Sequence, residues 1–128
     1  MKKLLTTLAA LIAASACTAT AQTADHGHHV EAPEISCAIR MTPTRHGMRF
    51  DALAEGFAPA RGAYEFILTK DDRGGSSDIV QGGDFDLLDG SRQTLGSAEL
   101  SLERGARYRA RLILSDEDGE LCRSEERS

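Results

Sequence analysis

The feature that most constrains the fold is an alternation of apolar and polar residues with a period of two, which begins near Glu34. It is clearest over residues 35–40, 64–69 and 107–114. Successive side chains of a β-strand point to opposite faces, so this alternation is typical of strands with one buried face. Glycine, proline and aspartate residues interrupt the pattern at short intervals, as turns do. The sequence therefore predicts an all-β fold, an immunoglobulin-like antiparallel β-sandwich of about seven strands.

The first 21 residues are typical of a secretory signal peptide. Lys2 and Lys3 precede an apolar stretch over residues 4–16, and Ala19 and Ala21 supply the small residues of a cleavage site. The apolar stretch is too short to span a bilayer and no later segment is longer, so no membrane span is expected. We divide the chain into a signal peptide (1–21), a flexible leader (22–33), the β-sandwich (34–123) and a C-terminal tail (124–128).

Cys17 allows a second interpretation of the N-terminus. The segment Ala14-Ser15-Ala16-Cys17 resembles a lipoprotein processing site, at which the cysteine is lipidated and becomes the first residue. Such sites usually carry leucine three residues before the cysteine, where this chain has Ala14. Export as a soluble protein is therefore favoured, and a lipid anchor at Cys17 is the alternative.

The charge balance excludes one class of partner. The chain of 128 residues has a formal net charge of −5. Loss of residues 1–21 removes two lysines and no acidic residue, which leaves 13 basic and 20 acidic residues and a net charge of −7. Binding of nucleic acid needs an excess of positive charge to displace counterions, so no nucleic-acid partner is expected. The length suffices for one domain, and we expect a monomer.

Two cysteines remain after cleavage, and they lie near the two ends of the alternating region. In an oxidising compartment such a pair, Cys37 and Cys122, predicts a disulfide, with two buried free thiols as the alternative. A bridge over so long a loop stabilises the fold by about 4–5 kcal/mol on the chain-entropy view. No Cys-x-x-Cys spacing is present, so a redox-active role is not expected.

The clearest surface feature in the sequence is a set of three arginines, Arg107, Arg109 and Arg111. They alternate with the apolar residues of 108–114, so in a strand they share the face opposite the core. This predicts a local positive stripe on an acidic protein. The alternative is an ordinary solvated face, or one neutralised by acidic neighbours across the sheet.

The leader contains three histidines, His26, His28 and His29, whose imidazoles suit Cu or Zn. Nothing in the surrounding sequence fixes their positions, so a preformed metal site is not expected. Catalysis is not expected either, because the chain has no Gly-x-Ser-x-Gly elbow and no histidine within the expected core strands. The sequence therefore predicts a non-enzymatic protein without a cofactor.

The pattern of residues 75–85 predicts a bulged edge strand. Ile79 and Val80 begin a short strand that Gly82 and Gly83 are expected to interrupt, since glycine inside a strand often marks a bulge or a close approach by another backbone. The segment is not a phosphate loop, because it lacks Gly-Lys-Ser/Thr and a following helix.

A family resemblance appears in the same segment. One run of residues carries it, with Cys37 before the run and Tyr108 and Cys122 after it: Gly75-Ser76-Ser77-Asp78-Ile79-Val80-Gln81-Gly82-Gly83-Asp84-Phe85. In this pattern the chain resembles the CsgH-type curli assembly proteins, which are relatives of the CsgC curli inhibitor. The resemblance covers residues 34–123, and Gln-Gly-Gly-Asp-Phe is its most specific part. It implies a periplasmic immunoglobulin-like protein that keeps curli subunits from forming amyloid before secretion. CsgC-like members carry a Cys-x-Cys pair, which this chain lacks, so no thiol-exchange role carries over.

The resemblance thus implies a chaperone-like inhibitor that contacts unfolded or oligomeric curli-type subunits transiently. The expected contacts are the arginine stripe and a strand edge shaped by Gln81, Gly82, Gly83, Asp84 and Phe85. The first alternative is a periplasmic Cu- or Zn-binding β-sandwich that uses His26, His28 and His29. The second is a structural or adhesive envelope module with no client.

Overall fold

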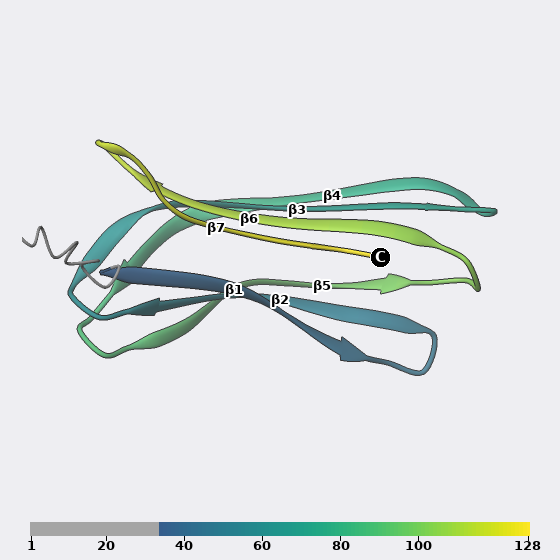
Figure 1. Cartoon of the computed structure of the whole chain (residues 1–128), viewed down its shortest axis with the longest axis horizontal. Coiled ribbons are helices and arrows are strands. Elements are labelled where there is room, and N and C mark those ends of the chain that lie inside the picture. The colour runs from purple at the N-terminus through teal and green to yellow at the C-terminus, as the bar shows by residue number, and fades with distance from the viewer. Residues whose placement is uncertain (1–33) are drawn as a thin grey trace, which may run out of the picture. The chain divides into compact units, whose positions relative to one another are not determined.

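The computed structural model describes residues 34–128 as seven strands in two antiparallel sheets (Figure 1). The signal peptide, Cys17 and the histidine-containing leader lie outside the described residues. The strands are β1 (Ile35–Pro43), β2 (Gly47–Gly56), β3 (Ala60–Asp72), β4 (Gly75–Leu87), β5 (Arg92–Ser101), β6 (Arg107–Asp116) and β7 (Gly119–Arg127). One sheet has the order β1-β2-β5 and the other β4-β3-β6-β7. The prediction of an antiparallel β-sandwich is confirmed.

The position of β4 distinguishes this sandwich from the constant-type immunoglobulin arrangement, in which the fourth strand shares a sheet with the fifth. Here β4 pairs with β3 over 13 residues, from Ala60 opposite Leu87 to Asp72 opposite Gly75. Only two residues separate these strands, and the turn is closed by a hydrogen bond from the Gly74 N–H to Asp72 Oδ1 at 2.8 Å. Gly75 follows at a φ of 116°, which glycine adopts without strain. So tight a hairpin requires β4 to lie beside β3.

The expectation that Gly82 and Gly83 interrupt this strand is wrong. β4 continues through both glycines, and its ladder with β3 shows no change of register. Register shifts occur instead between Ala52 and Leu53 of β2 and between Leu114 and Ser115 of β6. The reason is that β3 supplies an unbroken partner for β4, which outweighs the weak strand propensity of glycine.

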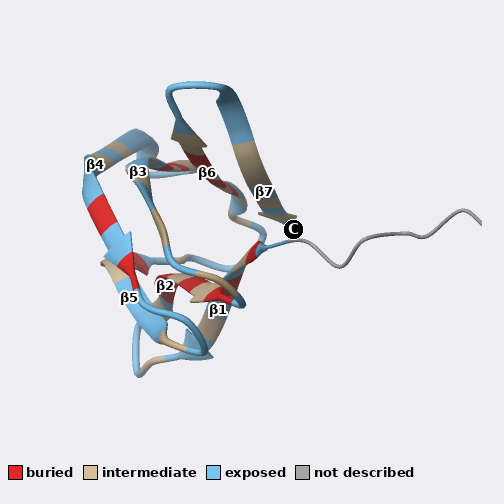
Figure 2. Ribbon diagram, turned by 90° about the vertical axis from the view of Figure 1, so that its left-hand side faces the viewer, coloured by how far each residue is buried: buried red, intermediate tan, exposed pale blue. Residues whose placement is uncertain are grey.

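The core lies between the sheets and consists of the inward residues of the alternating strands. The largest side chains that are fully buried are Phe50, Phe66, Leu68, Leu87, Leu112 and Leu114. Buried residues are found on strands of both sheets (Figure 2). Burial of each such side chain stabilises the fold by about 1.5–3 kcal/mol. The Tyr108 ring contacts the edge of this core, with its centroid 5.2 Å from that of Phe50.

The predicted disulfide is confirmed and joins the two sheets. Cys37 of β1 bonds to Cys122 of β7, with a Cα–Cα distance of 6.1 Å and a sequence separation of 85 residues. β1 and β7 are outer strands of different sheets that lie side by side. The bridge therefore closes one of the two open sides of the sandwich.

The C-terminal segment differs from the expected tail. β7 extends to Arg127, and residues 124–127 continue the ladder with β6 from Leu112 opposite Ser124 to Arg109 opposite Arg127. These last residues are all polar, so they carry no alternation that could indicate a strand. Among residues 34–128, no helix is long and apolar enough to cross a membrane.

Candidate functional site

The three arginines of the predicted stripe lie on the outer face of the four-stranded sheet. Arg107 and Arg109 are exposed and Arg111 is half-buried, whereas Ala110 and Leu112 of the same strand are fully buried. The period-two alternation of β6 thus separates a basic face from the core face. The stripe runs along β6, between β3 and β7.

A fourth arginine joins this stripe from the end of β7. Arg127 lies directly opposite Arg109 in the β6–β7 ladder. Like charges at opposed positions of neighbouring strands are destabilising. One carboxylate offsets this repulsion, since Glu125 Oε1 lies 3.4 Å from Arg109 Nε. Arg107, Arg111 and Arg127 form no ion pair with any carboxylate in the described part of the chain.

The basic end of this face is hollowed into an open depression of about 460 Å³. Its wall includes Arg107, Arg109 and Arg127, and Asp71 and Asp78 line the opposite side. The arrangement presents several guanidinium groups to solvent in one place, which suits carboxylate groups of a partner.

A larger groove of about 710 Å³ lies at the other end of the strands. Arg61 is the one cation of its lining, which consists mainly of acidic residues. These are Asp84, Asp86, Asp116, Glu117 and Asp118. Arg61 pairs with Asp86 at 3.5 Å. The face that carries the arginines therefore changes from basic to acidic along its length.

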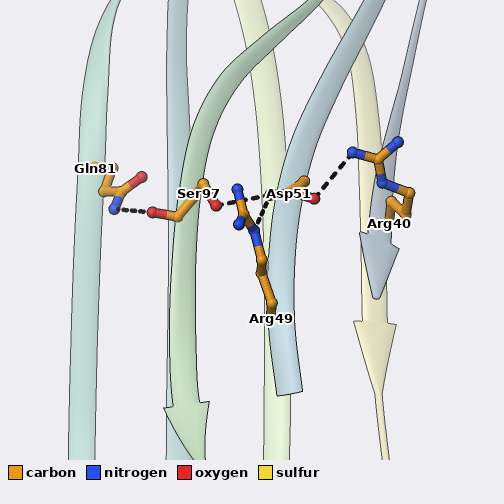
Figure 3. Close-up of polar contacts among 5 residues, drawn as sticks. All are labelled: Arg40, Arg49, Asp51, Gln81 and Ser97. Carbon is orange, nitrogen blue, oxygen red and sulfur yellow. Dashed lines mark hydrogen bonds and ion pairs between the residues drawn. The ribbon is translucent and has the colours of Figure 1, made fainter. Parts of the chain in front are cut away.

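The sequence predicts residues 81–85 as one contact site, but in β4 these residues alternate between the core side and the outer face of the sheet. Gln81 Nε2 donates a hydrogen bond to the Ser97 carbonyl oxygen at 2.9 Å (Figure 3). Phe85 belongs to the core, with 4% of its surface exposed, and a Cβ on Gly83 would lie 3.3 Å from Tyr64 Cε1. Of these five residues, only Gly82 and Asp84 occupy outward positions of β4. Gln81 and Phe85 thus stabilise the fold, and Gly83 leaves room for the Tyr64 ring.

A second group of charged residues lies on the outer face of the three-stranded sheet, and sequence reasoning missed it. Asp51 is 3% exposed and accepts hydrogen bonds from Arg40 Nη2 at 3.0 Å, Arg49 Nε at 3.0 Å and Ser97 Oγ at 2.7 Å (Figure 3). The Ser97 hydrogen bond is the largest cause that lowers the Asp51 pKa to about 2, and both arginines lower it further against the opposing effect of burial. Both arginines are thus already paired with Asp51, whose single negative charge offsets one of their two positive charges.

The sequence holds one signal of this network. Asp51 is an acidic residue between the apolar Phe50 and Ala52, and both of its neighbours are buried. A carboxylate so enclosed requires partners. Arg49 belongs to the same strand, but Arg40 and Ser97 come from β1 and β5, and their identity depends on the register of the sheet.

Metal ligands do not gather in the part of the chain that the structure describes. No group of three or more His, Cys, Asp or Glu side chains there could hold a metal ion. The histidines of the alternative interpretation, His26, His28 and His29, lie outside this part, so that interpretation remains a prediction.

Fold and site together define a small disulfide-bonded β-sandwich whose distinctive chemistry lies on a charged sheet face. The family model for CsgH protein matches residues 36–126. The chain belongs to the CsgH family.

Two solved structures share the fold. The solution structure of CsgH from R. palustris has a TM-score of 0.59 and 22% sequence identity, and the match covers 71% of this chain and 89% of that one. The E. coli curli protein CsgC has a TM-score of 0.61 and 11% identity, with 75% of this chain and 97% of that one covered. No curated protein matches the sequence.

Proposed function

We propose that this protein is a periplasmic, chaperone-like inhibitor of amyloid assembly by curli-type subunits, and that it acts as a binding protein, not as an enzyme. Membership of the CsgH family implies a role associated with curli. The disulfide supports a location outside the cytoplasm, since such bonds persist in oxidising compartments. The predicted signal peptide agrees with this location.

The observation that carries the proposal is the arginine stripe on the outer face of the four-stranded sheet, in which Arg109 is the one member that forms an ion pair within residues 34–128. The arginines at 107, 111 and 127 form no ion pair within residues 34–128, on a chain whose formal net charge is negative. Exposed charges of one sign attract an oppositely charged partner over roughly a Debye length, about 8–10 Å in ordinary buffers, and raise its association rate. An acidic, unfolded subunit is a partner of this kind.

The mode of inhibition follows from the way amyloid grows. Amyloid fibrils extend when strands add edge to edge to an existing template. A folded sandwich that binds the unfolded subunit or an early oligomer, even transiently, withdraws it from this addition. Nuclei are rare compared with monomers, so a protein that binds nuclei inhibits below equal stoichiometry.

Thioflavin fluorescence tests the proposal. The mature protein is mixed with a purified curli-type subunit, and the lag time is measured over a range of substoichiometric ratios. We expect the wild type to prolong the lag severalfold. A lag that the wild type leaves unchanged at every ratio contradicts the proposed function.

Matched variants test the stripe. The variant R107E/R109E/R111E should lose most of the inhibition. The control R45E/R73E/R104E makes the same change of net charge at three exposed arginines outside the strands and should inhibit like the wild type. Since Arg111 is half-buried, R107E/R109E is measured too, and thermal unfolding verifies that each variant is folded. Equal inhibition by the stripe and control variants removes the stripe from the mechanism.

A further inference from the structure

The outer face of the four-stranded sheet also carries an apolar patch, which the charge of the stripe does not explain. Val80 is 65% exposed, and it is the one large hydrophobic residue of the described chain that is exposed within a strand. Phe57 and Leu88, the other two exposed large hydrophobic residues, lie in loops.

The sheet register places one isoleucine beside Val80 and a second isoleucine diagonal to the first. Ile67 of β3 is directly opposite Val80, and on its other side Ile67 is opposite Arg111. Ile113 follows Arg111 by two residues on the same face of β6, and both isoleucines are half-buried. We call Val80, Ile67 and Ile113 the outer apolar patch.

Little covers this patch from the side of β4. The next outward position after Val80 is Gly82, which has no side chain that could shield it. Single exposed apolar residues are common and need no explanation, whereas contiguous apolar patches mark interaction sites. Ile67 connects Val80, which is directly opposite it, with Ile113, which lies diagonal to it and opposite Glu65. The patch adjoins the half-buried Arg111, whose Nε has no hydrogen-bond partner in residues 34–128.

The geometry of the face indicates what it fits. Outward side chains of a strand recur about every 6.6–6.8 Å, which is also the spacing of alternate side chains in any extended partner. An extended chain laid along β6 thus meets Arg107, Arg109 and Arg111 in turn, and then Ile113. Ile67 and Val80 extend the apolar surface from the row of Arg111 towards β4.

We propose that the outer face of the four-stranded sheet binds an extended segment with acidic side chains at alternate positions followed by an apolar side chain. This inference rests on the proposed function, since that segment would belong to the amyloid subunit. The arginines hold the carboxylates, and the outer apolar patch buries the apolar group. Charges act at a distance and set the association rate, whereas the apolar contact acts at short range and sets the dissociation rate.

A synthetic peptide makes the test independent of amyloid. The probe has glutamate at positions one, three and five and valine at position seven. Its control has the same composition with the glutamates adjacent. In NMR titrations of the mature protein, the probe should shift amide signals of β3, β4 and β6 and bind at least threefold more tightly than the control. Equal affinity for the two peptides, or shifts confined to other strands, overturns the inference.

Two single variants isolate the patch. Val80→Thr keeps a β-branched residue of similar size and should weaken probe binding severalfold without changing its salt dependence. Leu88→Thr removes an equally exposed apolar side chain in the loop after β4 and should bind like the wild type. If Val80→Thr also binds like the wild type, the patch is not part of the surface.

The two proposals fail separately. If the wild type binds the probe on this face but does not delay thioflavin fluorescence, the surface assignment stands and the proposed function is wrong. If the wild type delays fluorescence but does not distinguish the two peptides, the surface assignment is wrong and the proposed function stands.

Discussion

The side-chain amide of Gln81 donates a hydrogen bond to the main-chain carbonyl of Ser97 at 2.9 Å, and this bond links the outer strands of the two sheets. Lys70 Nζ makes a second bond of the same kind to the Ser101 carbonyl at 3.1 Å. Both acceptors belong to β5, which pairs with β2 on one side only. Side chains of one sheet thus bond to the edge strand of the other.

These bonds give the sandwich two differently closed sides. The disulfide between Cys37 and Cys122 joins β1 to β7, and Gln81 with Lys70 joins the opposite sheet to β5. An edge strand whose carbonyls are already bonded is a poorer template for an added strand. We expect this closure to protect the protein from the strand addition that it is proposed to prevent in its client.

Replacement of Gln81 by alanine tests the link between the sheets. Gln81→Ala removes the donor and leaves the Ser97 carbonyl without its partner, so the free energy of unfolding should fall by about 1–2 kcal/mol. Urea denaturation measures the change. Gln93→Ala is the control, since Gln93 is exposed on β5 and makes no side-chain hydrogen bond in the described chain. Equal stability of the two variants contradicts the prediction.

Gly96 gives a second, coupled test. A Cβ at this position would lie 2.6 Å from Gln81 Oε1, but 3.5 Å from the nearest atoms of Phe66 and Tyr64. Gly96→Ala should therefore displace the Gln81 side chain and break its hydrogen bond, at a cost no larger than that of Gln81→Ala. In the double variant the two losses should not add, because the same hydrogen bond is lost. A double-mutant cycle measured in urea checks this, and additive losses would show that the two residues act independently.

Asp51 should make stability fall in acid. Its pKa is about 2 in the folded protein, below the ordinary value of 3.8, so the folded state binds this proton less readily than the unfolded state. The resulting stabilisation of about 2 kcal/mol is complete above about pH 4 and disappears as the pH falls towards 2. Thermal unfolding at several pH values should show that the melting temperature of Asp51→Asn falls less steeply in acid than that of the wild type.

Part of the acid loss should remain in Asp51→Asn. The pKa values of Asp72 and Glu120 are also lowered, chiefly by hydrogen bonds from Lys70 and Arg123. Asp89→Asn is the control, since Asp89 is exposed in the turn after β4 and forms no ion pair within residues 34–128. A melting temperature that falls as steeply in acid for Asp51→Asn as for the wild type would show that the Asp51 network does not stabilise the fold through its charge.

Loss of the disulfide should be the most destabilising of these changes. The bond closes a loop of 85 residues, so its removal should lower the free energy of unfolding by about 4–5 kcal/mol through the entropy of the unfolded chain. Urea denaturation with and without dithiothreitol measures the effect. The variant C37A/C122A should be as unstable as the reduced wild type and should not respond to dithiothreitol. A wild type whose midpoint is unchanged by reduction contradicts the prediction.

The outcome at three places shows where sequence reasoning succeeds and where it stops. The faces of β6 follow from alternation, because the direction of a side chain in a strand depends only on its position within that strand. The continuation of β4 through Gly82 and Gly83 could not be predicted from local sequence, because it depends on the 13-residue ladder with β3. The polar end of β7 likewise becomes a strand only through pairing with β6.

The amino-acid sequence by itself determined which residues face the core, where the chain turns and which two cysteines could pair, because these depend on local periodicity and composition. The tertiary structure alone decided which charges meet. Asp51 finds Arg40 and Ser97 from positions 11 and 46 residues away, and Arg127 comes to lie opposite Arg109. Strand order and register bring these residues together, and both result from the closure of the whole sandwich. No single segment of the sequence contains the information that fixes which strands become neighbours.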